Sequence, residues 1–346
     1  MSKPHPPTIE DVARKAHVSI ATVSRVINGT APVIGETAQR VNAAIASLRY
    51  VPRTTARGLA SRKTNTLGLI LPEIGGWFFP SMLRGIETAA REAGYDLLIR
   101  TTDTSDSRKV SRWVLGMHNT DGLIVFTKSV GYEELAHLRS HNFPVVLLHQ
   151  TPPESLNIPV VTIENKSGAQ KLVDHLIEVH HCCRIVFLQG PESHEDSEWR
   201  ELGYLESLEA HNIPFDSSLV AAGEFDESVA AASISQLLID GVDFDAVFCG
   251  DDDAAIGVLT ALERAGRTVP DEVAVVGFDD VPLARFLSPS LTTVRAPTEQ
   301  VGADAVRQLI RLIRDERTDP LILLPTELVI RQSCGCHCTK GGDFSR

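Results

Sequence analysis

The first side chains that could do chemistry lie between Thr8 and Asn28, in the stretch TIEDVARKAHVSIATVSRVIN. Thr8 and Asp11 have the spacing of a capping box, with Asp in place of the usual Glu, and predict the start of a short helix. Ser19 predicts the cap of a second helix that ends at Asn28. Two short helices joined through residues 16–19 are typical of a helix-turn-helix.

The second helix carries groups that can contact DNA. A recognition helix places the residues near its N-terminus against base edges in the major groove. Arg25 can pair with guanine through two hydrogen bonds, whereas Ile20 and Ala21 can offer only apolar contact, for example to a thymine methyl. Contacts to phosphate, or helix capping, are expected from Ser19, Thr22, Ser24 and Asn28. An ordinary helical hairpin in a larger core is the alternative.

The distribution of charge favours DNA binding over that alternative. Residues 1–62 contain nine Lys and Arg against three acidic residues, a net charge of +6, although the whole chain carries −12. The remaining residues therefore carry −18. A basic segment joined to an acidic body is what phosphate binding predicts.

A third helix over 36–48 would complete a small helical domain, residues 1–52, because Val41, Ala44, Ile45 and Leu48 share one face. Residues 53–64 then form a hinge. Its helix-forming stretch is shorter than the ~12–15 residues that an isolated helix needs. We expect this hinge to be disordered without DNA and helical on it, with phosphate contacts from Arg53, Arg57 and Arg62.

From Leu67 onward, short apolar runs alternate with helical stretches. The apolar runs, which we expect to be strands, are 67–71, 96–100, 122–126, 145–148, 160–163, 184–189, 246–250, 273–278 and 291–294. The expected helices are 80–93, 106–118, 131–141, 165–179, 197–211, 252–265 and 297–315. Such alternation predicts an α/β body of two doubly wound lobes with parallel sheets, and a ligand crevice at the carboxyl ends of the strands.

Aromatic residues follow the first strand of this body. Trp77, Phe78 and Phe79 follow it after the loop PEIGG and could present ring faces to a ligand in the crevice. Three adjacent aromatic residues are, however, more often part of a core or an interface.

Acidic residues follow two later strands, at 251–253 and 279–280. An acid in this place either caps the next helix or accepts hydrogen bonds from ligand hydroxyls. We interpret Asp252 or Asp253 as the cap, and Asp251 and Asp279 as groups that bind ligand.

Two clusters could be mistaken for metal sites. His194, Glu195, Asp196 and Glu198 are better interpreted as a solvated helix start, because acids favour that end of a helix. The tail, residues 334–346, carries three Cys and one His within 334–338, but their alternate spacing makes a tetrahedral site from one loop awkward. We expect oxidation sensitivity or disorder in the tail, and no metal or cofactor.

Other features bound the class of protein. No run of 18 apolar residues predicts a membrane span, and the polar, Pro-rich start lacks a signal segment, so we expect a cytoplasmic protein with no membrane partner. Cys182, Cys183 and Cys249 lie in apolar or helical stretches and fit reduced thiols. The chain has no Gly-rich phosphate loop, HExxH or GxSxG, so nothing supports an enzyme.

Over nearly its full length, the chain resembles the LacI/GalR family of bacterial transcription regulators. Beyond TIEDVARKAHVSIATVSRVIN, the stretches that carry the resemblance are ETAQRVNAAIASLRYVP, ARGLASR, LGLILP, WFFPSMLRGIETAAREAGYDLLI, VPDEVAVVGFDDVPLARFLSPSLTTVRAP and PTELVIRQS. The chain departs from the family at three places. His17 stands where Gly is usual, Gly35 where a Ser cap is usual, and Arg49 where Gly usually precedes the Tyr.

The resemblance implies a body similar to a periplasmic sugar-binding protein, residues 65–333, in which the chain crosses between the lobes three times. Lobe 1 would comprise about 65–162 and 296–318, and lobe 2 about 163–295 and 319–333. In the hinge, Leu59 holds the position of the leucine that wedges into the minor groove in the family, where an inserted side chain kinks DNA. The alternative is a plain flexible linker.

The resemblance also points to effector-binding residues. Arg200 lies where the family has its effector-binding arginine, and Phe225 lies where a ring stacks on the ligand. His149 replaces what is often an acid. A site built from Trp77, Phe78, His149, Arg200, Phe225, Asp251 and Asp279 suits a neutral polyol, whereas a purine is the rival because stacking with Arg and Asp also suits a base edge.

We therefore predict a homodimeric transcriptional regulator, a tetramer being possible, that represses from a palindromic operator under control of a sugar or sugar derivative. A soluble sugar-binding protein would lack the basic segment and would normally carry an export signal. An enzyme would use the crevice acids as general acid and base, and would turn the sugar over.

Overall fold

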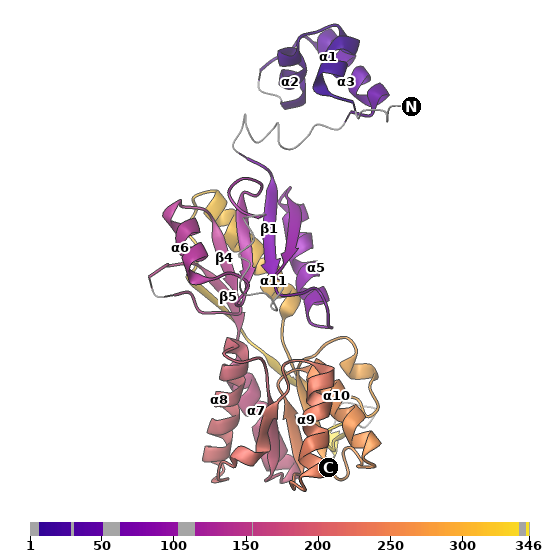
Figure 1. Cartoon of the computed structure of the whole chain (residues 1–346), viewed down its shortest axis with the longest axis vertical. Coiled ribbons are helices and arrows are strands. Elements are labelled where there is room, and N and C mark those ends of the chain that lie inside the picture. The colour runs from indigo at the N-terminus through magenta and orange to yellow at the C-terminus, as the bar shows by residue number, and fades with distance from the viewer. Residues whose placement is uncertain are drawn as a thin grey trace. The chain divides into compact units, whose positions relative to one another are not determined.

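The computed structural model describes residues 7–28, 31–50, 63–102, 115–153, 155–338 and 344–345 (Figure 1). The chain divides into two compact units, Met1–Asn65 with His118–Thr120 and Thr66–Met117 with Asp121–Arg346. We call residues 7–50 the head and the second unit the body. The hinge residues Arg53, Arg57, Leu59 and Arg62 lie outside the described residues, so their expected roles stay predictions.

Three helices form the head: α1 (Ile9–Ala16), α2 (Ile20–Asn28) and α3 (Gly35–Leu48). The predicted capping box is present, since the Thr8 Oγ1 accepts from the Asp11 N–H (3.3 Å) and the Thr8 N–H donates to the Asp11 Oδ2 (2.9 Å). The expected core forms around Val12, Val23 and Val41, which are fully buried. The head is thus a helix-turn-helix closed by a third helix.

Two of the three departures from the family pattern fall on left-handed backbone. His17 ends α1 with φ +54°, and Arg49 ends α3 with φ +49°. Glycine adopts this conformation without a steric penalty, which gives the physical reason for Gly at both positions in the family. The third departure, Gly35, is the first residue of α3, whose N-terminus has no side-chain cap.

The first lobe of the body is built on an entirely parallel sheet in the order β11-β5-β4-β3-β1-β2. Its strands are β1 (Thr66–Leu71), β2 (Asp96–Thr101), β3 (Gly122–Phe126), β4 (Val145–Leu148), β5 (Val160–Ile163) and β11 (Leu321–Leu324). Leu67, Leu69 and Leu71 pack with α5 (Phe79–Glu92) and α11 (Thr298–Ile313), whereas Ile70 packs with α6 (Tyr132–Ser140). This alternation puts helices on both faces.

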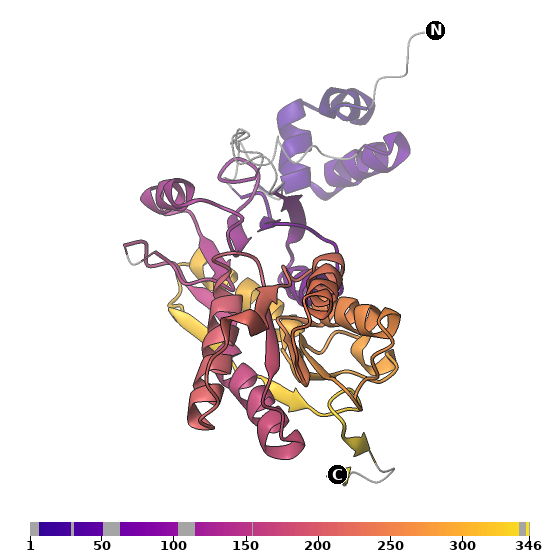
Figure 2. The same cartoon turned by 60° about the horizontal axis from the view of Figure 1, so that its bottom comes forward.

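The second lobe repeats the pattern, with the order β12-β10-β9-β8-β6-β7, of which only β12 is antiparallel. Its strands are β6 (Ile185–Gln189), β7 (Val220–Ala222), β8 (Ala246–Cys249), β9 (Ala274–Asp279), β10 (Thr292–Arg295) and β12 (Glu327–Val329). Its helices are α7 (Asn165–His180), α8 (Glu195–Ala210), α9 (Glu227–Ile239) and α10 (Asp252–Arg264), with 3-10 turns at Ser217–Leu219 and Ala284–Phe286. Figure 2 shows α7 and α8 side by side, and their pairing leaves α9 and α10 to cover the opposite face.

Beyond the second lobe, β13 (His337–Cys338) and β14 (Phe344–Ser345) form a two-stranded sheet. Among the described residues, no helix combines the length and the apolar character that a membrane span requires.

The structure corrects three expectations. β7 and α9, absent from the predicted elements, form one more strand-helix unit. β11 belongs to the first sheet, so the third crossing between lobes follows Leu324, and residues 321–324 are not part of lobe 2 as predicted. Residues 115–118, the described end of the expected helix 106–118, are not helical.

Candidate functional site

A cavity of about 520 Å³ lies between the two lobes. Its walls come from segments that follow the carboxyl ends of β1 and β3 in the first lobe, and of β6, β7, β8 and β9 in the second. Doubly wound sheets bind ligands at this edge. Five of the seven residues proposed to bind the effector line it: Phe78, Arg200, Phe225, Asp251 and Asp279.

Arg200, on α8, is the centre of the polar network on the second-lobe side. Its Nε donates to the Asn165 Oδ1 (2.9 Å), its Nη1 to the Gly250 carbonyl (2.5 Å), and its Nη2 lies 3.3 Å from the Asp279 Oδ1. The guanidinium also stacks over the Phe278 ring, 3.8 Å from its centroid. The side chain is 2% exposed. Packing and hydrogen bonds therefore fix a buried positive charge at the cavity wall.

Asp279 ends β9 in a strained conformation, with φ +106°, and lies beside Arg200. Burial raises the pKa of Asp279 to about 6, although the charge of Arg200 opposes that rise. The next residue, Asp280, also has positive φ (+55°) and turns away to pair with Arg295 and Arg331. The backbone thus directs one of the two adjacent carboxylates into the cavity and the other into a structural ion-pair network.

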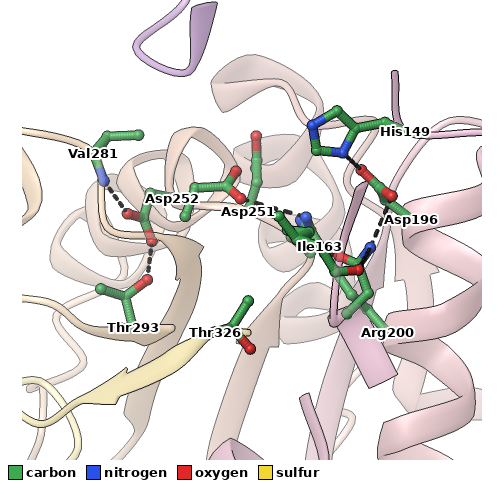
Figure 3. Close-up of polar contacts among 12 residues, drawn as sticks. His149, Ile163, Asp196, Arg200, Asp251, Asp252, Val281, Thr293 and Thr326 are labelled. Atoms are coloured by element: carbon green, nitrogen blue, oxygen red, sulfur yellow. Dashed lines mark hydrogen bonds and ion pairs between the residues drawn. The ribbon is translucent and has the colours of Figure 1, made fainter. Parts of the chain in front are cut away.

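His149 and Asp196 form a buried pair that joins the two lobes (Figure 3). His149 follows β4, and its Nδ1 lies 2.8 Å from the Asp196 Oδ2. The Asn165 Nδ2 donates to the other oxygen of Asp196 (2.8 Å). Burial alone would raise the pKa of Asp196. The charge of His149, its hydrogen bond to Asp196 and the charge of Arg200 together outweigh burial and lower this pKa. His149 does not line the cavity; it supports Asp196, which does.

The interpretation of the 194–198 cluster as a solvated helix start was therefore wrong for Asp196, which is 4% exposed. His194 also lines the cavity, and burial lowers the pKa of its imidazole to about 4, so the ring is neutral at pH 7. Glu195 bonds across to the first lobe, where it accepts from the N–H and hydroxyl of Thr151. His194 and Glu195 follow β6. Residues that follow the carboxyl end of a strand were expected to face the crevice, and this strand-end rule, which located Asp279, could also have located these two.

Aromatic rings line the cavity on both sides. Phe78 meets Phe126 edge-on, with centroids 6.1 Å apart, in the first lobe. In the second lobe the Phe225 ring meets the His194 ring edge-on, with centroids 5.1 Å apart. The Phe225 ring also packs against Gly190, where a Cβ would lie 2.3 Å from its Cζ. Only glycine at 190 leaves room for this ring. The cavity therefore combines aromatic rings with charged groups in its lining.

Trp77 differs from expectation. It is 47% exposed and lines a neighbouring pocket with Asp280 and Arg295 rather than the main cavity. Its backbone N–H donates to the Asp253 Oδ2 (3.2 Å), so it contributes a contact between lobes through its main chain. Of the three adjacent aromatic residues, Phe78 and Phe79 line the cavity.

The helix cap after β8 is not the acid that we expected. Asp251 caps α10, since its Oδ1 accepts from the Ala254 N–H (2.8 Å), although it still lines the cavity. Asp252 is a structural residue that accepts from the Thr293 hydroxyl (2.6 Å) and the Val281 N–H (2.9 Å) (Figure 3). Asp253, which together with Asp252 was considered as the cap, lines the cavity along with Asp251. Three consecutive acids after a strand do not reveal which one the helix will take as its cap.

Sequence reasoning missed other cavity residues. The cavity is also lined by Phe126, the last residue of β3, and by residues that follow strands β1, β3 and β7: Glu73, Thr127, Lys128 and Glu224. Lys128 also reaches across it, since its Nζ donates to the Glu192 carbonyl (2.6 Å). Their position at or after the carboxyl end of a strand could have identified those near β1 and β3 from the sequence. Glu224 could not be identified in this way, because β7 was not predicted.

The head presents its expected DNA-contacting residues at the start of α2. Ile20 is 47% exposed, and Ala21 and Arg25 are exposed. Ser19 caps α2, as its Oγ accepts from the Thr22 N–H (3.2 Å) and lies 2.9 Å from the Thr22 Oγ1. Ser24 is half-buried, and the side chain of Asn28 lies outside the described residues. Helix α2 thus offers one exposed cation, Arg25, together with the exposed apolar side chains of Ile20 and Ala21.

Comparison with known proteins gives two family matches. Residues 8–53 match the model of bacterial regulatory proteins of the lacI family, and residues 173–334 match a periplasmic binding protein-like domain. The chain is 35% identical to the ribose operon repressor of Halalkalibacterium halodurans, over 98% of each chain. It is 34% identical to catabolite control protein A of Priestia megaterium, over 94% of this chain and 98% of the other.

Solved structures are similar over nearly the same extent. The complex of the transcriptional regulator CelR with cellobiose is 32% identical, with a TM-score of 0.70, over 94% of this chain and 99% of the other. The lac repressor dimer bound to operator and the anti-inducer ONPF is 25% identical, with a TM-score of 0.82, over 95% of this chain and 99% of the other. Family members are transcriptional regulators and not enzymes. This chain, with its DNA-binding head and its two-lobed body, belongs to the lacI family of bacterial regulatory proteins.

Proposed function

We propose that this DNA-binding transcriptional regulator takes a sugar or sugar derivative into the cavity of the body, and that the sugar controls how tightly a homodimer holds a palindromic operator. The observation that carries the proposal is the composition of the cavity. Phe78 and Phe225 line the same cavity of about 520 Å³ as the buried Arg200 and Asp279 and the half-buried His194. Rings can cover the apolar face of a sugar while charged groups take its hydroxyls.

Control of DNA binding requires the ligand to favour one arrangement of the lobes over another. Four contacts cross between the lobes around the cavity: Lys128 to Glu192, Thr151 to Glu195, His149 to Asp196 and Trp77 to Asp253. A sugar between the lobes adds to or replaces these contacts, so its affinity differs between open and closed arrangements. That difference in affinity is the free energy available to the switch.

Relatives support a sugar over a purine as the ligand. The names of two similar proteins carry ribose and cellobiose, and those reported above name no nucleobase. The cavity volume fits a mono- or disaccharide within the range usual for small-molecule sites.

For the DNA side, we propose that Ile20, Ala21 and Arg25 contact bases, that Leu59 wedges into the minor groove, and that backbone contacts come from Ser19, Thr22, Ser24, Asn28, Arg53 and Arg57. The lac repressor relative was solved as a dimer on its operator. Two heads related by a twofold axis match an inverted repeat. A tetramer remains compatible with this arrangement.

A thermal-shift panel tests the ligand. Pentoses, hexoses, disaccharides, adenine and guanine are each added to the purified chain, because a ligand that binds only the folded state raises the melting temperature. We expect a shift with one class of sugar, its loss in Arg200→Gln, and its retention in Arg264→Gln, whose exposed side chain lies at the far end of α10. Operator binding of the Arg200 variant should persist without responding to the sugar. A shift with nucleobases alone would reject the sugar.

A further inference from the structure

Two cysteines of the C-terminal segment and two histidines of α7 converge on one point of the second lobe. The ligand-type atoms of His175, His180, Cys334 and Cys336 all lie within 4.8 Å of one another. The His175 Nε2 lies 3.6 Å from the Cys334 Sγ and 3.7 Å from the Cys336 Sγ, and the His180 Nε2 lies 3.3 Å from the Cys336 Sγ. These contacts join residues that are about 160 positions apart in the sequence.

We propose that these four residues form a structural zinc site of the Cys₂His₂ type. Zinc in such sites is tetrahedral, with bonds of about 2.3 Å to sulfur and about 2.05 Å to nitrogen, which place adjacent S and N ligands about 3.6 Å apart. The three S–N distances, 3.3–3.7 Å, match that edge length. The donor set also selects the metal, since tetrahedral S₂N₂ coordination is typical of zinc.

The geometry of the cluster is held by its surroundings. Ser333 anchors the segment before the cysteines, because its Oγ donates to the Val275 carbonyl (2.6 Å) and accepts from the Thr292 N–H (2.8 Å). The Thr292 hydroxyl donates to the Cys334 Sγ (3.1 Å). Hydrogen bonds from outside the ligand set orient metal ligands and stabilise thiolates.

Gly335, between the two cysteines, fits the same interpretation. Its φ is +103°, and a Cβ there would lie 3.1 Å from the His180 Nδ1. The Cys-Gly-Cys turn can therefore fold closely over the imidazole only with glycine in the middle. This turn brings Sγ atoms two residues apart onto the same centre.

Burial is consistent with a metal ion as well. Cys334 and Cys336 are 2% and 4% exposed, and His175 is 9% exposed. A buried cluster of this kind keeps water away from the bound ion, as closed structural zinc sites do. Zinc binding would release the two thiol protons, and two thiolates with Zn²⁺ leave no net charge inside the protein.

Within the tail alone, the spacing of the three Cys and one His does not suit one metal. Disorder or oxidation sensitivity was the expectation for residues 334–346, but Cys334 and Cys336 are buried against the second lobe. The missing half of the donor set is on α7, where His175 and His180 are five residues apart, a spacing common for paired zinc histidines.

The site is separate from the effector cavity. Ser333 and Cys334 contact the amino ends of β9 and β10, whereas Asp279 at the carboxyl end of β9 lines the cavity. The zinc would therefore fasten the C-terminal segment to the second lobe without a role in effector binding.

The test measures metal in the full-length chain, expressed without a histidine tag, purified under reducing conditions and supplied with Zn²⁺. We expect about one zinc per chain by elemental mass spectrometry after gel filtration. His180→Asn and Cys336→Ser should lose it, and the matched neighbours His181→Asn and Cys183→Ser, whose side chains are exposed, should keep it. A strong chelator should lower the melting temperature of the wild type and of these two controls.

Cobalt gives a readout that does not depend on the variants folding. Replacing zinc by Co²⁺ in the wild-type chain should produce the intense visible absorption of tetrahedral cobalt with thiolate charge-transfer bands. Wild-type protein that holds no more zinc than the Cys336 variant, and shows only the weak spectrum of hydrated cobalt, would overturn the site. A Cys334–Cys336 disulfide in freshly reduced protein, seen as a loss of two hydrogen masses, would overturn it as well.

Discussion

Asp279 is the residue at which the electrostatics of the cavity can be tested by pH. Burial raises the pKa of its carboxyl from 3.8 to about 6, so the group changes charge within an accessible range. Below about pH 6 it is protonated and donates a hydrogen bond; above that it is a carboxylate that accepts from ligand hydroxyls.

We expect the affinity for the sugar to increase between pH 5 and pH 7, because the ligand hydroxyls stabilise the carboxylate that burial disfavours. Stability should follow the opposite trend. The pKa is higher in the folded than in the unfolded chain, so this group's contribution, roughly 3 kcal/mol, is complete below about pH 4 and is lost as pH rises through 6. Titration calorimetry measures the sugar affinity across this pH range, and urea unfolding measures the stability. Asp279→Asn should flatten both pH profiles. An unchanged slope in that variant would assign the titration to another group.

Arg25 gives the corresponding test for the head. It is the exposed cation of α2 and follows the exposed Ile20 and Ala21 by about one turn. We expect Arg25→Ala to relax the preference for one base pair by ~1–3 kcal/mol, since a bidentate contact to guanine is lost. Binding to a set of operators varied at one position at a time measures this. A uniform loss on every operator would instead indicate a phosphate contact.

At this scale the sequence identifies types of residue better than their roles. The strand-end rule located Asp251, Asp253 and Asp279 at the cavity, because parallel strands bring their carboxyl ends together. It could not decide which of three adjacent acids caps α10, since that depends on fractions of a turn in the backbone. Pairings such as His149 with Asp196 join residues 47 positions apart and become visible only in the fold.

Helix pairing in the body depends on glycines at the points of closest approach. A Cβ on Gly85 of α5 would lie 1.9 Å from the Glu299 carbonyl oxygen of α11, and one on Gly302 of α11 would lie 2.4 Å from the Met82 carbonyl oxygen. The pair α9–α10 has the same feature, since a Cβ on Gly257 of α10 would lie 2.0 Å from the Glu227 carbonyl oxygen of α9. The obstacle in each case is backbone, which cannot move as a side-chain tip can.

We therefore expect Gly85→Ala to destabilise the chain by about 3 kcal/mol or more, because α5 and α11 must separate to admit the methyl group. Gly131→Ala is the matched control, because Gly131 precedes α6 as its N-cap with φ −75° and has open space where the methyl group would go. Urea unfolding of both variants measures the difference. Equal midpoints would mean that the helices can slide apart without loss of packing.

Long, regular elements were predictable and short or weakly patterned ones were not. β1, β3 and β9 are continuous apolar runs bounded by polar residues, as buried parallel strands are. β7 has only three residues, and α9 is rich in Ala and Ser with a weak apolar face. The position of β11 was misassigned because neighbouring strands β11 and β12 join different sheets, a choice that local sequence does not encode.

Charge separates the two ends of the chain at the scale of the whole molecule. Residues 1–62 carry +6 and the remainder −18, so the attraction for DNA is confined to the first segment. We expect operator affinity to fall by ~10³–10⁵ between 50 and 200 mM salt, as counterions compete for the phosphates. Filter binding or fluorescence anisotropy over a salt series measures the slope. Sugar affinity, carried by a buried cavity, should change little over the same series, and a parallel decrease would place the ligand on the surface.

The three connections between the lobes have one more consequence. They run through residues 163–165, 295–298 and 324–327, and two of them are bonded to each other, since the Glu164 N–H donates to the Leu324 carbonyl (2.8 Å) and the Thr326 hydroxyl donates to the Glu164 carbonyl (3.0 Å). A single protease cut in any one of these three connecting segments leaves the lobes joined covalently by the other two. Clipped protein should therefore migrate as one particle until it is denatured, and only then separate into fragments.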